Sequence, residues 1–192
     1  ISVQDKYTAV QDNFNRFVRQ NELWNSKYMC ISGIPKENMS EDGLQQYGED
    51  LRGIADVYRD KGILLTFHPV HTDYTDIEGR PAVDRLMEHL PEDVQLTICL
   101  YHTVKAGLDP IKYLTDFSGR IDMVHFKNSI ILPNGQEVLM PIGQGSIQWS
   151  EIFKACHKTG VKWGFVEQES WQKDAFVCAQ ESFDYVTLHG IH

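Results

Sequence analysis

The sequence has few positively charged residues for its length. Lysine and arginine together number 18 among 192 residues, against 27 aspartates and glutamates, and the formal net charge at pH 7 is -9. A protein that binds nucleic acid through its phosphates needs clustered lysine and arginine side chains, and the sequence contains no such cluster. We therefore expect no nucleic-acid partner.

Long hydrophobic runs are also absent. No apolar stretch approaches the roughly 18 residues that a helix needs to cross a bilayer, and no basic segment followed by an apolar one indicates a secretory leader. With 42% hydrophobic and 11% aromatic residues, the chain can bury one substantial core. These features predict a cytoplasmic protein without a membrane span, in which residues 1–192 form a single domain.

Cysteine is sparse and shows no paired spacing. Cys30, Cys99, Cys156 and Cys178 lie far apart and form no C-x-x-C or zinc-finger pattern. Such spacing is typical of reduced thiols in a reducing compartment. We expect most of them to pack as small hydrophobic side chains.

Short apolar segments alternate with helical ones along the chain. Strands are predicted at 27–33, 63–68, 94–101, 121–127 and 163–169, and helices at 5–23, 40–62, 82–90, 110–117, 149–159 and 175–187. Strict alternation predicts a parallel sheet covered by helices, either an open doubly wound sheet or a β/α barrel. No G-x-G-x-x-G or G-x-x-x-x-G-K-[ST] motif occurs, so nucleotide binding by an open sheet loses support. The barrel is favoured, although a complete one has eight strands.

Residues that can bind a metal or move a proton stand at the ends of three predicted strands. His68 ends the strand at 63–68, His125 and Lys127 end the strand at 121–127, and Glu167 lies near the end of the strand at 163–169. Alternate residues of a strand share a face, which places His125 and Lys127 together. Because catalytic groups of β/α barrels collect at the carboxyl ends of the strands, this pattern predicts a site there.

Several motifs occur in an order that resembles one known superfamily. They are His125-Phe-Lys127-Asn128, Pro141-Ile-Gly143-Gln144-Gly145-Ser-Ile-Gln-Trp149, Gly160-Val-Lys-Trp163-Gly-Phe-Val-Glu167-Gln168, Leu65-Thr-Phe-His68 and Ala106-Gly107-Leu-Asp109-Pro110. Together they resemble the xylose isomerase-like sugar phosphate isomerase/epimerase superfamily, also called endonuclease IV-like. The resemblance covers essentially the whole chain and implies a (β/α)8 TIM barrel of which this chain carries strands four to eight. The first three β/α units are then absent, and either the chain is a fragment or another polypeptide segment completes the barrel.

The resemblance also implies a divalent cation, typically Mn²⁺ or Mg²⁺, held by Glu, Asp, His and Glu. The histidine of that set falls on His125 and the last glutamate on Glu167, whereas the aspartate position holds Cys99. The first position falls around Phe67 and His68, where there is no glutamate. A thiol ligand moves the preference toward softer metals such as Zn²⁺, or abolishes binding if it keeps its proton. We predict His68, Cys99, His125 and Glu167 as metal ligands.

Further polar and aromatic residues near the strand ends are predicted to contact substrate. These are His71, His102, Gln144 and Trp149. Two of them replace residues frequent in the superfamily, His102 a tryptophan and Gln144 the glutamate of a G-E-G motif. For Trp149, packing in the core is the simpler interpretation.

The resemblance implies an isomerase or epimerase that acts on a keto sugar by metal-assisted proton transfer. Lys127 or the metal would polarise the carbonyl, and Glu167 or a histidine such as His68 would move the proton. A sugar lyase or dehydratase uses the same first step, and a non-catalytic carbohydrate-binding member is a further alternative. A fragment that associates with itself or with a complementing N-terminal segment is a third possibility.

Overall fold

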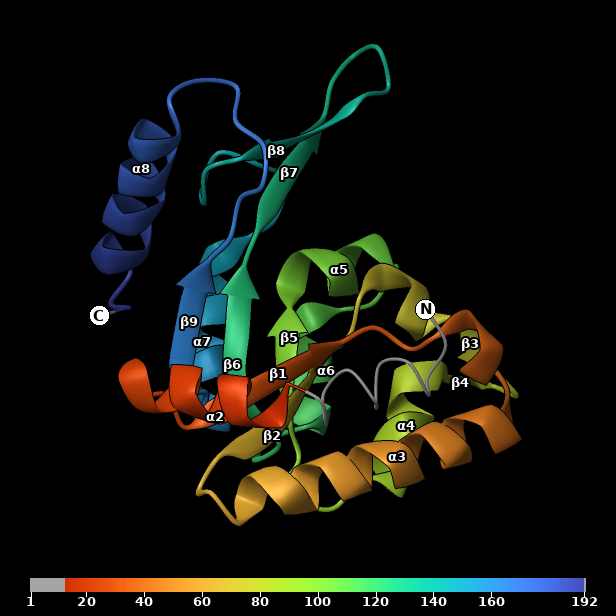
Figure 1. Ribbon diagram of the computed structural model, residues 1–192. Coiled ribbons are helices and arrows are strands. Elements are labelled where there is room, and N and C mark those ends of the chain that lie inside the picture. Colours follow the sequence, from red (N-terminus) through yellow and green to blue (C-terminus); the bar gives the residue numbers. More distant parts are fainter. Residues whose placement is uncertain (1–12, 192) are drawn as a thin grey trace. The chain divides into compact units, whose positions relative to one another are not determined.

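The computed structural model of the protein describes residues 13–191 (Figure 1). They fall into two compact units, one extending to Thr97 and the other beginning at Ile98. The prediction of a single domain over 1–192 stays a prediction. The helix predicted from residue 5 is described only in its second part, as α2 (Phe14–Leu23), and its beginning lies outside the described residues.

The first unit is built on parallel strands. Strand β1 (Tyr28–Ser32) pairs with β2 (Leu64–His68), and β2 pairs with β5 (Gln95–Cys99), which continues into the second unit. The pairing of β1 with β2 places Ser32 opposite His68. The strands are therefore parallel, as predicted, and their carboxyl ends lie at one edge of the sheet.

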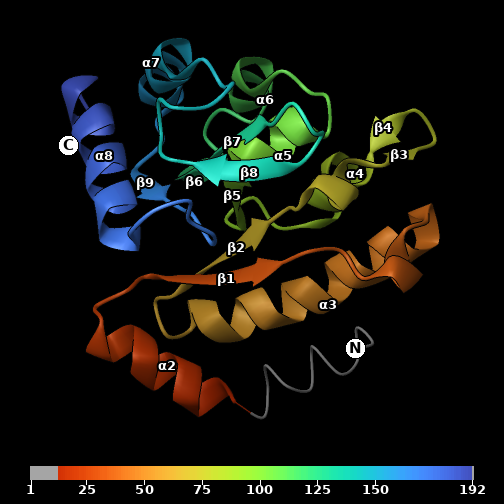
Figure 2. The same ribbon diagram turned by 90° about the horizontal axis from the view of Figure 1, so that it is seen from above.

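A long helix and a short one pack together in the first unit. Helix α3 (Glu41–Arg59) begins after Ser40, whose hydroxyl accepts a hydrogen bond from the Gly43 amide at 3.2 Å, as expected of an N-cap. Its apolar stripe lies along β2 and against helix α4 (Ala82–His89) (Figure 2). The buried residues of α3 are Leu44, Tyr47, Gly48, Leu51, Ile54, Ala55 and Tyr58.

A buried carboxylate ties together the loops that follow β1 and β2. Asp73 lies in a short 3-10 helix, η2 (His71–Tyr74), which precedes the small strand pair β3 (Asp76–Ile77) and β4 (Arg80–Pro81). Its two oxygens accept hydrogen bonds from the Ile34 amide at 3.1 Å and the Val70 amide at 2.8 Å. Another 3-10 turn, η1 (Lys36–Asn38), precedes α3. Asp73 thus fixes the backbone beyond the strand ends, where sequence patterns predict functional residues.

The second unit pairs β6 (Ile121–Phe126) with β9 (Trp163–Val166) in parallel, with His125 opposite Phe165. Its helices are α5 (Leu100–Lys105), α6 (Pro110–Asp116), α7 (Trp149–Thr159) and α8 (Ala175–Leu188). Asp109 caps α6 by accepting from the amides of Ile111 and Lys112 at 2.8 and 3.3 Å. Gly160, with φ at +80°, ends α7 in the left-handed conformation that favours glycine.

The core of the second unit gathers aromatic rings from α7 and β6. The Trp149 ring lies 5.7 Å from that of Phe126, edge to face, and 5.8 Å from that of Phe153, stacked. Only 1% of Trp149 is exposed. The structure therefore supports the core interpretation of Trp149 and gives no support to its predicted contact with substrate.

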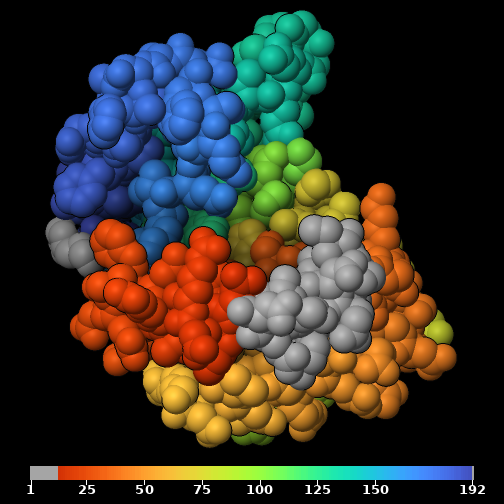
Figure 3. Space-filling model, viewed as in Figure 1, coloured from red at the N-terminus to blue at the C-terminus, as the bar shows by residue number. Residues whose placement is uncertain are grey.

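Three features differ from the sequence-based expectations. The strand predicted to reach Tyr101 ends at Cys99, and the next residues form α5. Strand β9 ends at Val166, before Glu167. The segment after Lys127, for which neither strand nor helix was predicted, contains a hairpin, β7 (Asn128–Ile131) with β8 (Glu137–Met140). The tip of this hairpin projects from the surface in green-blue in Figure 3.

Two predictions from composition can be compared with the described residues. Between residues 13 and 191, no helix combines the length and the apolar character needed to span a bilayer. None of the four cysteines is in a disulfide. Cys99, Cys156 and Cys178 are buried and Cys30 is exposed, which confirms that most of them pack as small hydrophobic side chains.

Candidate metal and proton-transfer site

Three residues that can bind a metal lie near the ends of strands in the second unit. Cys99 is the last residue of β5, His125 lies on β6, and Glu167 follows β9. The Glu167 amide donates to the carbonyl of Phe126 at 3.0 Å, which extends the pairing of β6 with β9 by one more hydrogen bond. The backbone ladder itself therefore places the Glu167 side chain beside His125.

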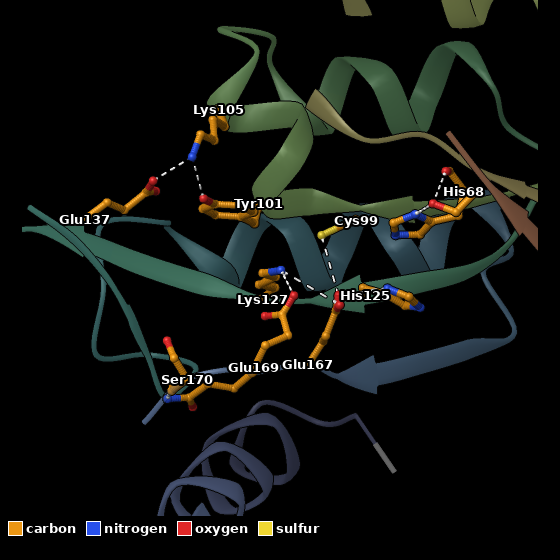
Figure 4. A network of polar contacts seen from close by, with 12 residues as sticks. His68, Cys99, Tyr101, Lys105, His125, Lys127, Glu137, Glu167, Glu169 and Ser170 are labelled. Atoms are coloured by element: carbon orange, nitrogen blue, oxygen red, sulfur yellow. Dashed lines mark hydrogen bonds and ion pairs between the residues drawn. The ribbon is translucent and has the colours of Figure 1, made fainter. Parts of the chain in front are cut away.

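Three potential ligand atoms converge in this unit (Figure 4). Glu167 Oε2 lies 2.9 Å from His125 Nδ1 and 3.8 Å from Cys99 Sγ, and the ligand atoms of the three residues all lie within 4.8 Å of one another. Around a tetrahedral zinc ion, with metal–ligand distances of about 2.0–2.3 Å, neighbouring ligand atoms lie roughly 3.3–3.8 Å apart. The spacing of these donors therefore fits a metal ion after small side-chain adjustments.

Burial sets the protonation of Cys99. The side chain is fully buried, and the loss of hydration raises the pKa of its thiol to about 12, with the nearby charge of Glu167 acting in the same direction. At neutral pH, Cys99 is a thiol that donates a weak hydrogen bond to Glu167. Metal binding at this position requires that proton to leave.

Lys127 is a buried cation between two carboxylates. Its ammonium forms an ion pair with Glu169 and lies 3.8 Å from Glu167 Oε1, while the residue is only 5% exposed. Burial acts to lower the pKa of Lys127, but the hydrogen bond with Glu169 and the charges of both glutamates outweigh it, and the pKa is raised. Lys127 is therefore charged at neutral pH, and it acts as a hydrogen-bond donor rather than as a base.

A second polar network extends from Lys127 along α5. The Lys127 Nζ lies 5.1 Å from the centre of the Tyr101 ring, and the Lys105 Nζ lies 5.2 Å from it. Lys105 donates to the Tyr101 hydroxyl at 2.8 Å and to Glu137 of β8 at 2.6 Å. Sequence reasoning missed this network because it assigned Tyr101 to a strand. The signal that could have found it is the helical i, i+4 spacing of Tyr101 and Lys105.

Comparison with known proteins identifies the family. The model of the xylose isomerase-like TIM barrel family matches residues 16–183. The chain belongs to this family. The match confirms the predicted resemblance and the predicted fold class.

Individual relatives of this TIM-barrel chain are distant. An inosose dehydratase of Lacticaseibacillus casei is 25% identical over 150 residues, which cover 70% of this chain and 50% of the relative. A sugar phosphate isomerase/epimerase of Parabacteroides distasonis ATCC 8503 superposes with a TM-score of 0.79 at 18% identity, over 95% of this chain and 66% of that one. IolI protein with a bound zinc atom superposes with a TM-score of 0.74 at 16% identity, over 96% of this chain and 70% of that chain. The chain spans about half the length of the curated relative, and the structural matches show the shared fold.

The remaining predicted residues of this TIM-barrel chain have varied surroundings. His102 is half-buried on α5, with its ring 5.1 Å from that of Tyr101. Gln144 is exposed and donates to Glu181 of α8 at 2.7 Å. His71 is exposed at the start of η2, and His68 is buried at the end of β2, both in the first unit. Within the second unit, the structure brings together Cys99, His125, Lys127 and Glu167.

Proposed function

We propose that this protein is a metal-dependent enzyme that moves a proton beside the carbonyl group of a polyhydroxylated ketone. The observation that carries the proposal is the cluster of Cys99, His125 and Glu167 with the charged Lys127 next to it. Relatives named as an inosose dehydratase and as a sugar phosphate isomerase/epimerase support this class of reaction. The products are an isomer, an epimer or a dehydrated ketone.

Cys99, His125 and Glu167 would hold the cation. A set of one sulfur, one nitrogen and one oxygen favours Zn²⁺ over the harder Mn²⁺ and Mg²⁺, and a zinc atom is bound in the similar IolI structure. When bound, a divalent cation polarises a carbonyl oxygen as a Lewis acid. The contribution of His68 as a further ligand stays a prediction from its position at the end of β2.

Lys127 and Glu167 have complementary tasks in this proposal. The ammonium of Lys127 donates a hydrogen bond to the carbonyl oxygen as negative charge develops there. Glu167 points Oε2 toward His125 and Oε1 toward Lys127, so one oxygen can serve as ligand while the other takes the proton from the adjacent carbon. Delivery of a proton to the opposite face by a second acid, such as water, epimerises the ketone, and return of the proton from Glu167 to the neighbouring carbon isomerises it. Departure of a β-hydroxyl group as water dehydrates it.

A non-catalytic sugar-binding protein is the second candidate. The high pKa of the buried Cys99 thiol favours it, because a thiol that keeps its proton is a poor metal ligand. The two functions are separated by incubating the protein with ketohexoses, ketopentoses and inososes, each with Zn²⁺, Mn²⁺ or Mg²⁺. Chromatography detects isomers and epimers, and absorbance detects dehydrated ketones. Sugar binding by calorimetry without any turnover would favour the binding protein.

The purified protein is expected to contain about one zinc ion per chain, because the three donors fit tetrahedral coordination. Elemental analysis of the protein and of His125→Ala and Glu167→Ala measures this, and both variants should lose the metal. His157→Ala is the matched control, since His157 is an exposed histidine of α7, and its metal content should not change. His68→Ala tests the predicted additional ligand. Full metal content in both His125→Ala and Glu167→Ala would contradict the proposed site.

A further inference from the structure

Ser32 and His68 form a hydrogen-bonded pair in the first unit. The parallel register of β1 and β2 places these residues opposite each other. Ser32 Oγ lies 3.0 Å from His68 Nδ1 and also 3.0 Å from the His68 carbonyl oxygen. The Gly33 amide donates to the same carbonyl at 3.1 Å. His68 is 8% exposed, so its ring is held almost entirely within the protein.

Counting hydrogens decides how the pair is bonded. A serine hydroxyl has one hydrogen to donate, and a neutral histidine has a donor on one ring nitrogen only. If Ser32 donated to Nδ1, the hydroxyl oxygen and the His68 carbonyl oxygen would face each other at 3.0 Å with no hydrogen between them. If Ser32 donates to the carbonyl, Nδ1–H donates to Oγ, and both short contacts are hydrogen bonds. The second arrangement gives the hydroxyl, Nδ1 and the carbonyl oxygen a hydrogen bond each.

We infer that Ser32 is a positioning residue that holds His68 in the Nδ1–H tautomer and thereby gives Nε2 the lone pair with which it binds a metal ion. Metal-binding histidines commonly donate their other ring N–H to an oxygen, which orients the ring and fixes the tautomer. Here the oxygen is the hydroxyl of Ser32, for which sequence patterns predicted no role. The metal-binding part of the inference rests on the proposed function, whereas the tautomer does not.

The tautomer is measured directly by nitrogen NMR. In metal-free protein labelled with ¹⁵N-histidine at pH 8, where ordinary histidines are neutral, His68 is expected to carry its hydrogen on Nδ1. His68→Gln assigns the signals. Ser32→Ala should move His68 toward the Nε2–H form, and Ser32→Thr, which keeps the hydroxyl, should restore the Nδ1–H form. Ser26→Ala is the matched control, because Ser26 also donates to a strand carbonyl, that of Tyr28 at 3.2 Å.

Zinc titration of the same proteins tests the metal-binding part. Ser32→Ala should weaken zinc binding about 10- to 100-fold, as loss of an orienting partner does, while Ser32→Thr and Ser26→Ala should bind like the unchanged protein. An Nε2–H signal for His68 in the unchanged protein overturns the inference, whatever its activity. The inference is also overturned if His68 keeps its Nδ1–H signal in the Ser32→Ala variant. The expected tautomer in a protein that binds no zinc overturns the proposed function and the metal-binding part, and leaves the tautomer assignment confirmed.

Discussion

Replacing Lys127 with methionine is expected to lower kcat on the active ketone by about 100- to 1,000-fold, the loss typical of a removed donor to a developing oxyanion. The charged group disappears while the methionine keeps most of the apolar stem in its buried position. Zinc content should stay unchanged, because Cys99, His125 and Glu167 remain. Steady-state kinetics together with elemental analysis of the same preparation measures both effects.

Lys105→Met is the matched control for this variant. Lys105 lies at nearly the same distance from the Tyr101 ring as Lys127 does, 5.2 against 5.1 Å, but its carboxylate partner is Glu137 of the hairpin. We expect Lys105→Met to change kcat by less than threefold. Equal activity of the Lys127→Met and unchanged proteins would remove Lys127 from the proposed reaction. A loss of zinc in Lys127→Met would mean that the lysine supports the metal site instead.

Replacing Trp149 with alanine is expected to lower the free energy of unfolding by about 3–5 kcal/mol, the usual cost of truncating a buried large aromatic side chain. The indole is almost fully buried and packs against Phe126 and Phe153, so its removal leaves a cavity beside β6. Since the free energy of unfolding of a domain is only about 5–15 kcal/mol, this variant should unfold at a far lower urea concentration than the unchanged protein. Urea unfolding followed by circular dichroism measures the change.

Trp24→Ala serves as the comparison for Trp149→Ala. Trp24 is 83% exposed at the end of α2, and removal of an exposed side chain usually changes stability by about 0.5 kcal/mol or less. If Trp149→Ala cost no more than Trp24→Ala, the indole would not be part of the core. The prediction that Trp149 contacts substrate would then regain support.

Local sequence signals predicted several elements closely. The expected helix at 149–159 is α7 (Trp149–Thr159), because its apolar spacing and the glycine that ends it are properties of neighbouring residues. The predicted end of the strand at 94–101 was wrong, because no local signal marks the change from strand to helix there. A continuous apolar run is compatible with a buried strand or a buried helix, and at 94–101 the chain changes from one to the other after Cys99.

The candidate site was predicted in part. Strand-end patterns and the family resemblance pointed to Cys99, His125, Lys127 and Glu167, which the structure brings together in the second unit. The link from Tyr101 and Lys105 to Glu137 was missed, because Lys105 and Glu137 are 32 positions apart and belong to a helix and a hairpin that no motif connects.

The alternation of strands and helices, the family and the residue types at the strand ends follow from the sequence, because they are ordered patterns along the chain. The tertiary structure alone decided that Lys127 is a buried cation, that Cys99 is a thiol and that Trp149 belongs to the core. These properties depend on which faces are covered and on strand register, which sets His125 beside Glu167 although 42 positions separate them. The hydrogen bonds of Ser32 to His68 have the same origin, since only the pairing of β1 with β2 makes these residues neighbours.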